Sequence, residues 1–328
     1  MLHRNHQRAA RSLCRAVSLA ACLALVFVAT RSAAAQQKTQ ESGETSVTTL
    51  TDGALTIEVK TRGTVELTDN DADVKSISEG GYFSVKEKRG AATVRQLEIV
   101  PAPGGGLRRK YSVGGQPRES DAEAGAWLGS VLPKVMREST LGSAARVRRI
   151  LGQRGVEGVL EEVASMKSDY VKRVYQQKLL ELQNYDAATS ARVLEHAGRS
   201  LSSEYERAEL LLDVLRHDRL DDGARAAFFK TLDALGSDYE QRRVLTQVVE
   251  KHAPAQGPLN MEMVGAAFQS AMRLTSEYEL AEFLIDFVKH RPLDDAVRPA
   301  FMAALDKIQS EHERARAASV LPKGERRP

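Results

Sequence analysis

The sequence predicts an α+β protein in which a small antiparallel β domain is followed by an α-solenoid of about five helical hairpins. Two periodicities support this fold class: apolar and polar residues alternate in residues 54–116, and apolar residues recur with helical spacing from residue 120 onward. A third observation is a short motif that recurs at nearly constant intervals in the C-terminal half, which is typical of repeat proteins.

The first 35 residues have the three-part pattern of a secretory signal peptide. Arginines precede an uncharged apolar stretch, and small residues end at Ala35. We therefore predict cleavage after Ala35 and a periplasmic or secreted protein. Two alternatives remain open, a lipoprotein acylated at Cys22 and an uncleaved anchor, and both also place the protein outside the cytoplasm.

The composition after this leader excludes several kinds of site. The chain has 47 Lys and Arg and 44 Asp and Glu; the leader holds five arginines and no acid, so 42 basic and 44 acidic residues remain. This mildly acidic balance argues against nucleic-acid binding. Both cysteines, Cys14 and Cys22, lie in the leader. The rest of the chain therefore has no disulfide, thiol nucleophile or cysteine-ligated zinc.

The segment after the leader divides into a tether and a β-rich domain. Residues 36–53 are rich in Gln, Ser, Thr, Glu and Gly, and we expect a flexible tether there. Residues 54–142 form the predicted β-rich domain, in which a helix from Ser120 onward carries Trp127 and covers one face of the sheet. Turn residues separate the expected strands. These strands are 55–59, 64–67, 82–86, 93–100 and 107–113.

Residues 143–321 form the predicted helical repeat domain. A serine followed by an acid and a tyrosine or histidine recurs after 35, 34, 39 and 34 residues. Serine is a favoured N-cap, and a glutamate three residues later completes a capping box in four of the five copies, so each motif starts a helix. The caps are Ser168, Ser203, Ser237, Ser276 and Ser310. Residues 322–328 are expected to be a disordered tail.

A second helix precedes each cap. The pattern of residues 220–228 returns in residues 293–301, in both cases 17 residues before the capping serine. Each unit is therefore two antiparallel helices, with the length of known helical-hairpin solenoids. The Trp and Leu-Gly pair of the tetratricopeptide signature is not visible, so we predict a HEAT-like array or a generic α-solenoid of helical hairpins, which HEAT and TPR proteins share as an architecture.

The residues two positions after the caps are the candidate interaction surface. They are Tyr170, Tyr205, Tyr239, Tyr278 and, in the last copy, His312. Packing between successive units is the simpler interpretation, and an exposed aromatic ladder that holds a peptide or glycan is the alternative. The acid after each serine is expected to offset the positive end of its helix, because every repeat has one whereas a catalytic pair would be unique.

We predict no metal site and no cofactor. Asp69, Asp71 and Asp73 have a spacing that hints at calcium, but an EF-hand loop needs Gly and Glu where Val74 and Gly80 stand. A polar turn is therefore expected. No two of the histidines after the leader are four residues apart, and His217, His252 and His290 fall near helix C-termini, where a cation suits the dipole.

We also predict no catalytic residue. The sequence lacks a Gly-x-Ser-x-Gly nucleophile elbow, a Ser-x-x-Lys pair, a P-loop and a dinucleotide-binding glycine motif. The basic clusters Arg108-Arg109-Lys110 and Arg146, Arg148, Arg149 are expected to be solvated surface. Contact with anionic lipid headgroups is the alternative for them.

Three stretches together suggest a family. TRGTVELTDNDADVKSISEGGYFSVKEKRG, DAEAGAWLGSVLP and the SDY repeats resemble the C-terminal extracytoplasmic segment of some membrane zinc metallopeptidases of the beta-lactam-sensor type, and also stand-alone exported bacterial proteins. The resemblance covers roughly residues 50–320. It implies a sensing or interaction segment. It does not imply peptidase activity, because His-Glu-x-x-His is absent and the nearest string, His312-Glu313-Arg314-Ala315-Arg316, lacks the second histidine.

We therefore expect a non-catalytic exported protein that uses its helical-repeat surface to bind another envelope or periplasmic protein. No nucleic-acid partner is expected, and peripheral membrane contact is an alternative. A second functional hypothesis is a sensor or regulatory accessory of an envelope-stress or antibiotic-response system, which follows from the resemblance. A third is a hydrolase of unfamiliar type that uses carboxylates.

Overall fold

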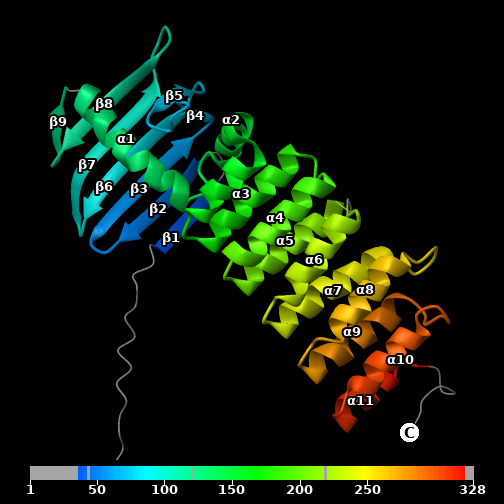
Figure 1. Ribbon diagram of the computed structural model, residues 1–328. Coiled ribbons are helices and arrows are strands. Elements are labelled where there is room, and N and C mark those ends of the chain that lie inside the picture. Colours follow the sequence, from blue (N-terminus) through cyan, green and yellow to red (C-terminus); the bar gives the residue numbers. More distant parts are fainter. Residues whose placement is uncertain (1–35, 43–44, 120, 218–219, 322–328) are drawn as a thin grey trace, which may run out of the picture. The chain divides into compact units, whose positions relative to one another are not determined.

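The computed structural model describes residues 36–42, 45–119, 121–217 and 220–321 (Figure 1). The predicted signal peptide and the predicted tail lie outside the described residues. Within them strands come first and helices follow, which confirms the α+β class. None of the helices in these ranges is long and apolar enough to cross a membrane.

In the described part of the chain, seven antiparallel strands form the main sheet in the order β1-β2-β3-β6-β7-β8-β9, and two further strands form a small separate sheet. Short turns join most neighbours, as the strand spacing predicts. The strands of the main sheet are β1 (Gln36–Ser42), β2 (Thr45–Asp52), β3 (Leu55–Arg62), β6 (Tyr82–Arg89), β7 (Ala92–Pro101), β8 (Leu107–Val113) and β9 (Gln116–Arg118). The small sheet pairs β4 (Val65–Leu67) with β5 (Val74–Ile77).

The expectation of a flexible tether at 36–53 is wrong, because β1 and β2 extend the sheet there. Threonine and valine fill alternate places in β2, and such β-branched residues suit a strand. Thr48 and Leu50 are buried, and Leu50 lies opposite Ile57 of β3. The polar composition of the segment hid this alternation.

A helix, α1 (Asp121–Glu138), lies across one face of the sheet, as predicted (Figure 1). The indole Nε1 of Trp127 donates a hydrogen bond to Glu87 Oε2 at 2.9 Å, and its ring lies 5.9 Å from that of Tyr111. Both aromatic residues belong to the core between α1 and the sheet. Trp127 is thus an anchor of this domain, with its polar edge satisfied.

Each capped helix follows a described helix, so α2–α3, α4–α5, α6–α7, α8–α9 and α10–α11 form the five predicted hairpins within the described residues. Odd-numbered helices from α3 pack against one another in one layer, and α4, α6, α8 and α10 form a second layer. The helices are α2 (Ser143–Ala164), α3 (Asp169–Leu182), α4 (Ala187–Ser200), α5 (Glu204–His217), α6 (Asp222–Asp233), α7 (Asp238–His252), α8 (Met261–Ala271), α9 (Glu277–His290), α10 (Arg298–Lys307) and α11 (Glu311–Ala318).

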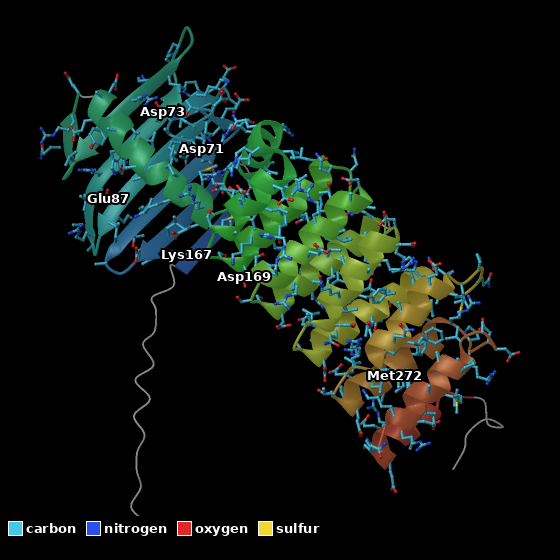
Figure 2. The ribbon with its side chains drawn as sticks, viewed as in Figure 1. Asp71, Asp73, Glu87, Lys167, Asp169 and Met272 are labelled. Atoms are coloured by element: carbon cyan, nitrogen blue, oxygen red, sulfur yellow. The ribbon has the colours of Figure 1, made fainter. Side chains whose placement is uncertain are left out.

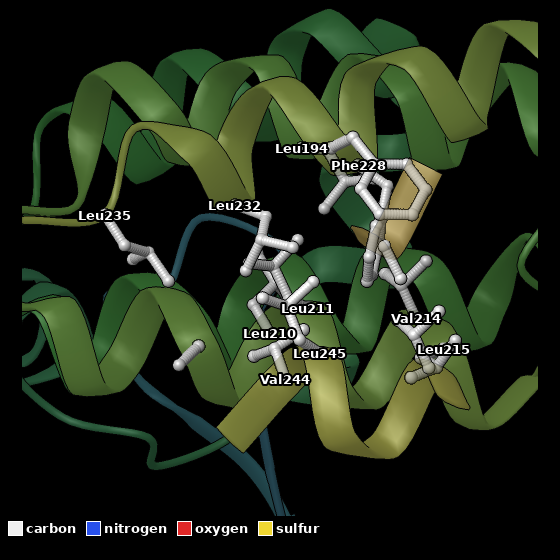
Figure 3. Packing of buried hydrophobic residues seen from close by; sticks show 14 of the residues in the cluster. Leu194, Leu210, Leu211, Val214, Leu215, Phe228, Leu232, Leu235, Val244 and Leu245 are labelled. Carbon is white, nitrogen blue, oxygen red and sulfur yellow. The ribbon is translucent and has the colours of Figure 1, made fainter. Parts of the chain in front are cut away.

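One continuous hydrophobic core runs between the two layers. Figure 3 shows its centre, where Leu211 of α5, Phe228 of α6 and Leu245 of α7 converge with no exposed surface. A single hairpin cannot bury its own apolar face, so stacking of successive hairpins creates this core.

The first capped helix also contacts the end of α1. Tyr175 of α3 is fully buried, and its hydroxyl donates to the carbonyl oxygen of Met136 at 3.0 Å. Burial raises the pKa of the Tyr175 phenol to about 12, so it remains a neutral donor at physiological pH. This bond satisfies a carbonyl in the last turn of α1, which helix geometry leaves without an intrahelical partner.

Candidate interaction surface

All five predicted serines cap their helices. Each serine Oγ accepts a hydrogen bond from the backbone N–H three residues later, over distances of 3.3 to 3.4 Å. The second half of the predicted capping box is different. The backbone N–H groups of Ser203, Ser276 and Ser310 donate to an acid of the preceding repeat rather than to their own glutamate.

The acid after each serine therefore links neighbouring repeats. Asp169 Oδ2 accepts from the N–H groups of Ser202 and Ser203, both at 2.7 Å. Asp238 Oδ2 accepts from the N–H and hydroxyl of Thr275 and from the N–H of Ser276. Glu204 and Glu277 make equivalent bonds to the next repeat, to Gly236 and to Gln309 and Ser310. Besides their expected effect on the dipole of their own helix, these acids therefore accept hydrogen bonds from the backbone at the start of the next capped helix.

The four predicted tyrosines project from the layer of odd-numbered helices. They are the large hydrophobic residues that remain exposed among the described residues, together with Met261. About half of each tyrosine is exposed, so packing between successive units, the simpler interpretation of the sequence, covers only part of each ring. Tyr170, Tyr205, Tyr239 and Tyr278 are 44%, 51%, 54% and 51% exposed.

An arginine lies over each of these rings at 5.2 to 5.5 Å from the ring centre, which is a cation–π distance. For Tyr170 and Tyr239 the arginine is in the same helix, at Arg173 and Arg242. For Tyr205 and Tyr278 it comes from the next odd-numbered helix. Those two arginines are Arg243 over Tyr205 and Arg316 over Tyr278.

Glutamates of α5 and α9 hold these arginines in place. Arg173 pairs with Glu206 of α5 at 2.5 Å, and Arg243 of α7 pairs with Glu209 of α5 at 2.8 Å. Around α9 the same arrangement returns, with Arg242 bound to Glu279 and Arg316 bound to Glu282. We call the four tyrosines with these arginines and glutamates the tyrosine face.

Two arginines of the tyrosine face, Arg242 and Arg316, have raised pKa values. Burial alone would lower the pKa of Arg242, but the hydrogen bond and charge of Glu279, with Asp286 nearby, outweigh it and raise that pKa. The hydrogen bonds of Glu282 and Glu313 likewise raise the pKa of Arg316. The ion pairs with glutamates thus position the arginines over the rings.

The alternation between neighbouring repeats reflects an internal duplication of two hairpins. Of the 41 residues from 203 to 243, 20 are identical to the residue 73 positions further along. Tyr205, Glu206, Glu209 and Arg243 all have an identical counterpart. Sequence reasoning missed the arginines and glutamates of the tyrosine face, and this longer period was the signal that could have found them.

His312 replaces tyrosine in the last repeat. Its side chain is 80% exposed, and its Nε2 lies 3.9 Å from Glu313 Oε1. No arginine is placed over it among the described residues. The predicted candidate residues therefore divide into four arginine-covered tyrosines and one exposed histidine at the end of the array.

A groove lies between α5 and α7 beside this face. It has a volume of about 460 Å³, and Leu212 and Leu215 provide its apolar surface. Arg243, which covers Tyr205, also lines it, with Arg216 and Gln247. A volume of this size accommodates a large side chain or a short segment of a partner.

The three aspartates before β5 do not form a calcium site. Figure 2 labels Asp71 and Asp73. Asp71, only 5% exposed, binds Arg149 and has Arg146 Nε at 3.3 Å, and Nη2 of Arg109 donates to both carboxylate oxygens of Asp73, at 2.9 and 2.8 Å. Arginines occupy the carboxylate oxygens that a cation would need. Arg146 is also 5% exposed, which corrects the expectation that its cluster is solvated surface. Among the described residues no group of three or more acids, histidines or cysteines could hold a metal ion.

The nearest approach to a nucleophile and base is on one turn of α4. Ser200 Oγ lies 3.1 Å from His196 Nδ1, which also lies 2.9 Å from the side-chain amide nitrogen of Gln176. Burial and the charge of Arg199 lower the pKa of His196, so its imidazole is neutral at physiological pH. Since an amide N–H can only donate, Nδ1 is an acceptor here. The hydrogen bond from Gln176 to His196 therefore joins α3 to α4, and the contact of Ser200 with His196 lies within α4.

Comparison with family models, with curated proteins and with solved structures finds no match to this chain.

Proposed function

We propose that this protein is a non-catalytic exported interaction module whose helical array binds another protein of the cell envelope through the tyrosine face. The observation that carries the proposal is the exposure of four equivalent tyrosines, each with an arginine over its ring. Tyrosine and arginine are enriched among the residues that dominate binding energy in protein interfaces.

The geometry favours a protein partner because the face is ordered before binding. Each arginine is held by a glutamate, so little side-chain entropy is lost when a partner covers it. The aromatic rings supply apolar area with a polar hydroxyl at the edge, which suits a surface that faces water in the free protein and a partner in the complex. The groove at Leu212 and Leu215 can receive a side chain of the same partner.

The experiment is chemical crosslinking in cells, followed by affinity purification and mass spectrometry. The test variant is the double substitution Tyr205→Ser with Tyr278→Ser. The matched control is Met261→Ser, which removes an exposed hydrophobic residue of 45% exposure from α8, in the other layer. We expect the double variant to weaken binding of the recovered partner by at least about tenfold, because an interface tyrosine can contribute about 2 kcal/mol.

Equal recovery of the partner with the double variant and with the wild-type chain would contradict the proposal. The tyrosine variants are expected to fold, since the substituted rings lie outside the core. A thermal unfolding curve of each purified variant checks this independently of binding.

A further inference from the structure

The two faces of the main sheet differ in chemistry. The face beneath α1 carries the buried residues Val59, Val85 and Leu97. Because successive residues of a strand point to opposite faces, the alternate residues of β3, β6, β7 and β8 share the other face, which we call the open face. None of its charged residues is buried. Its cations are Lys60, Arg62, Lys86, Lys88, Arg108 and Lys110, and its carboxylates are Glu58 and Glu98.

The open face carries a net positive charge, although the chain after the leader is close to neutral overall. Its six cations and two carboxylates give a formal charge of +4, whereas the chain after the leader has 42 basic and 44 acidic residues. A field of this sign on one face attracts anions even when the whole protein is close to neutral.

Four of these six cations have no ion-pair partner in the described part of the chain, since Arg62 donates to the carbonyl oxygen of Gly80 and lies over the ring of Tyr82 but meets no carboxylate. Lys60 and Lys88 flank Glu58 at 3.2 and 2.9 Å. Burial acts to raise the pKa of Glu58, but the hydrogen bonds and charges of these lysines outweigh it and lower that pKa. By contrast, Lys86, Arg108 and Lys110 form no ion pair with another described residue, although Lys110 lies opposite Glu98. Their charges are available to an external partner.

The cations are spread over a surface rather than gathered in a cleft. Continuous strand pairing places Lys60 on β3, Lys86 on β6 and Lys110 on β8, and neighbouring strands are about 4.8 Å apart. At one end of the face, the guanidinium of Arg62 lies 5.2 Å from the ring centre of Tyr82. Tyrosine beside cations is typical of the membrane–water interface.

From this arrangement we propose that the open face binds the anionic headgroups of a phospholipid bilayer as a peripheral contact. A site for one phosphate would need donors that converge, whereas this face presents separate cations over four strands, which matches a surface of many anions. Long lysine side chains reach such a surface without burying the sheet. Each basic residue near an anionic bilayer contributes about 1 kcal/mol. The proposal is independent of the tyrosine face, which lies on the helical array.

The test is sedimentation of the purified protein with vesicles of phosphatidylglycerol and phosphatidylcholine, against vesicles of phosphatidylcholine alone. The variant Lys86→Glu with Lys110→Glu reverses two unpaired charges of the open face. The control Lys134→Glu with Lys230→Glu makes the same change in net charge at exposed residues of α1 and α6. We expect binding to the anionic vesicles only, and a loss of at least about thirtyfold in the vesicle partition coefficient for the first variant, since two cations are removed and two anions added.

Three results would overturn the proposal: equal binding to both kinds of vesicle, equal loss in both variants, or binding to soluble dextran sulfate without binding to vesicles. Weakening of vesicle binding at high salt in the wild-type chain is also required, because exposed charges are screened. A folding defect in the first variant would be visible in its circular dichroism, and Arg108→Gln then provides a milder test with a loss of about fivefold. Failure here leaves the tyrosine-face crosslinking result unaffected.

Discussion

The β domain with α2 and the helical array use arginine–carboxylate pairs in opposite ways. Arg146 and Asp71 form a single buried cluster that joins α2 to the turn before β5. In the array, Arg173–Glu206 and Arg242–Glu279 are repeated and partly exposed. We infer that loss of one member of the buried pair is costly because it leaves a charge buried without its partner, whereas a repeated surface pair shapes a face and contributes little stability.

Removal of Arg146 gives the largest expected effect. Arg146→Ala leaves the buried Asp71 and the half-buried Glu162 with fewer partners, and loss of one member of a buried pair costs about 3–5 kcal/mol. The urea midpoint of unfolding should therefore fall markedly. Arg148→Ala, at an exposed residue of the same helix, should change stability by less than about 0.5 kcal/mol. Similar effects of the two substitutions would contradict the distinction.

Removal of Asp238, an acid that links neighbouring repeats, is expected to have the second largest effect on stability. Asp238→Ala leaves the N–H groups of Thr275 and Ser276 without their acceptor, which costs about 1–3 kcal/mol. Glu311→Ala changes the same position of the last repeat, where the described residues contain no following repeat, and should cost less than about 0.5 kcal/mol. Equal urea midpoints for the two variants would show that these acids act only on the dipole of their own helix.

Removal of an N-cap serine within the array is expected to have the third largest effect on stability. Ser276→Ala removes the acceptor for the N–H of Glu279 and should cost about 1 kcal/mol. Ser276→Gly should cost only a few tenths of that amount, because glycine is tolerated at an N-cap. Thermal unfolding of the two variants measures the difference, and a glycine variant less stable than the alanine variant would count against a capping role.

The smallest expected effect is a pH dependence at low pH. Burial acts to raise the pKa of Asp294, but hydrogen bonds from Arg291 and from the N–H of Val297 outweigh it and lower that pKa below 3.8. A carboxyl with a lowered folded pKa adds stability above its unfolded pKa, and this stability is lost as pH falls through the folded pKa. Asp294→Asn should therefore flatten the decline of stability below about pH 4. An unchanged decline in Asp294→Asn would contradict this.

Local features were predictable from the sequence, and features that depend on distant partners were not. The serine caps follow from three or four adjacent residues, and all five were correct. The exposure of Tyr205 and the covering by Arg243 depend on how one repeat meets the next, which residue type does not reveal. Arg146 looked solvated within its basic cluster because its partner Asp71 is 75 residues away in sequence.

The misjudged segment at 36–53 has a different cause. Its Ser, Thr and Gln content is that of a linker, yet β2 buries Thr48 and Leu50 because β3 offers a pairing edge and a shared core. Composition alone therefore did not predict the strands in residues 36–53, because pairing with β3 determines the conformation of β2. The open face, in contrast, follows from the alternation of lysine with apolar residues in β3 and β6, once the strand register is known.

The central claim is that the tyrosine face is the surface that meets another protein. The most direct measurement is photo-crosslinking in cells, with a photoreactive amino acid placed in turn at residues 170, 205, 239 and 278, and at 230 and 261 in the other layer. The account predicts one partner crosslinked from several of the first four positions and from neither of the last two. A partner crosslinked equally from both layers, or only from 230 and 261, would contradict it.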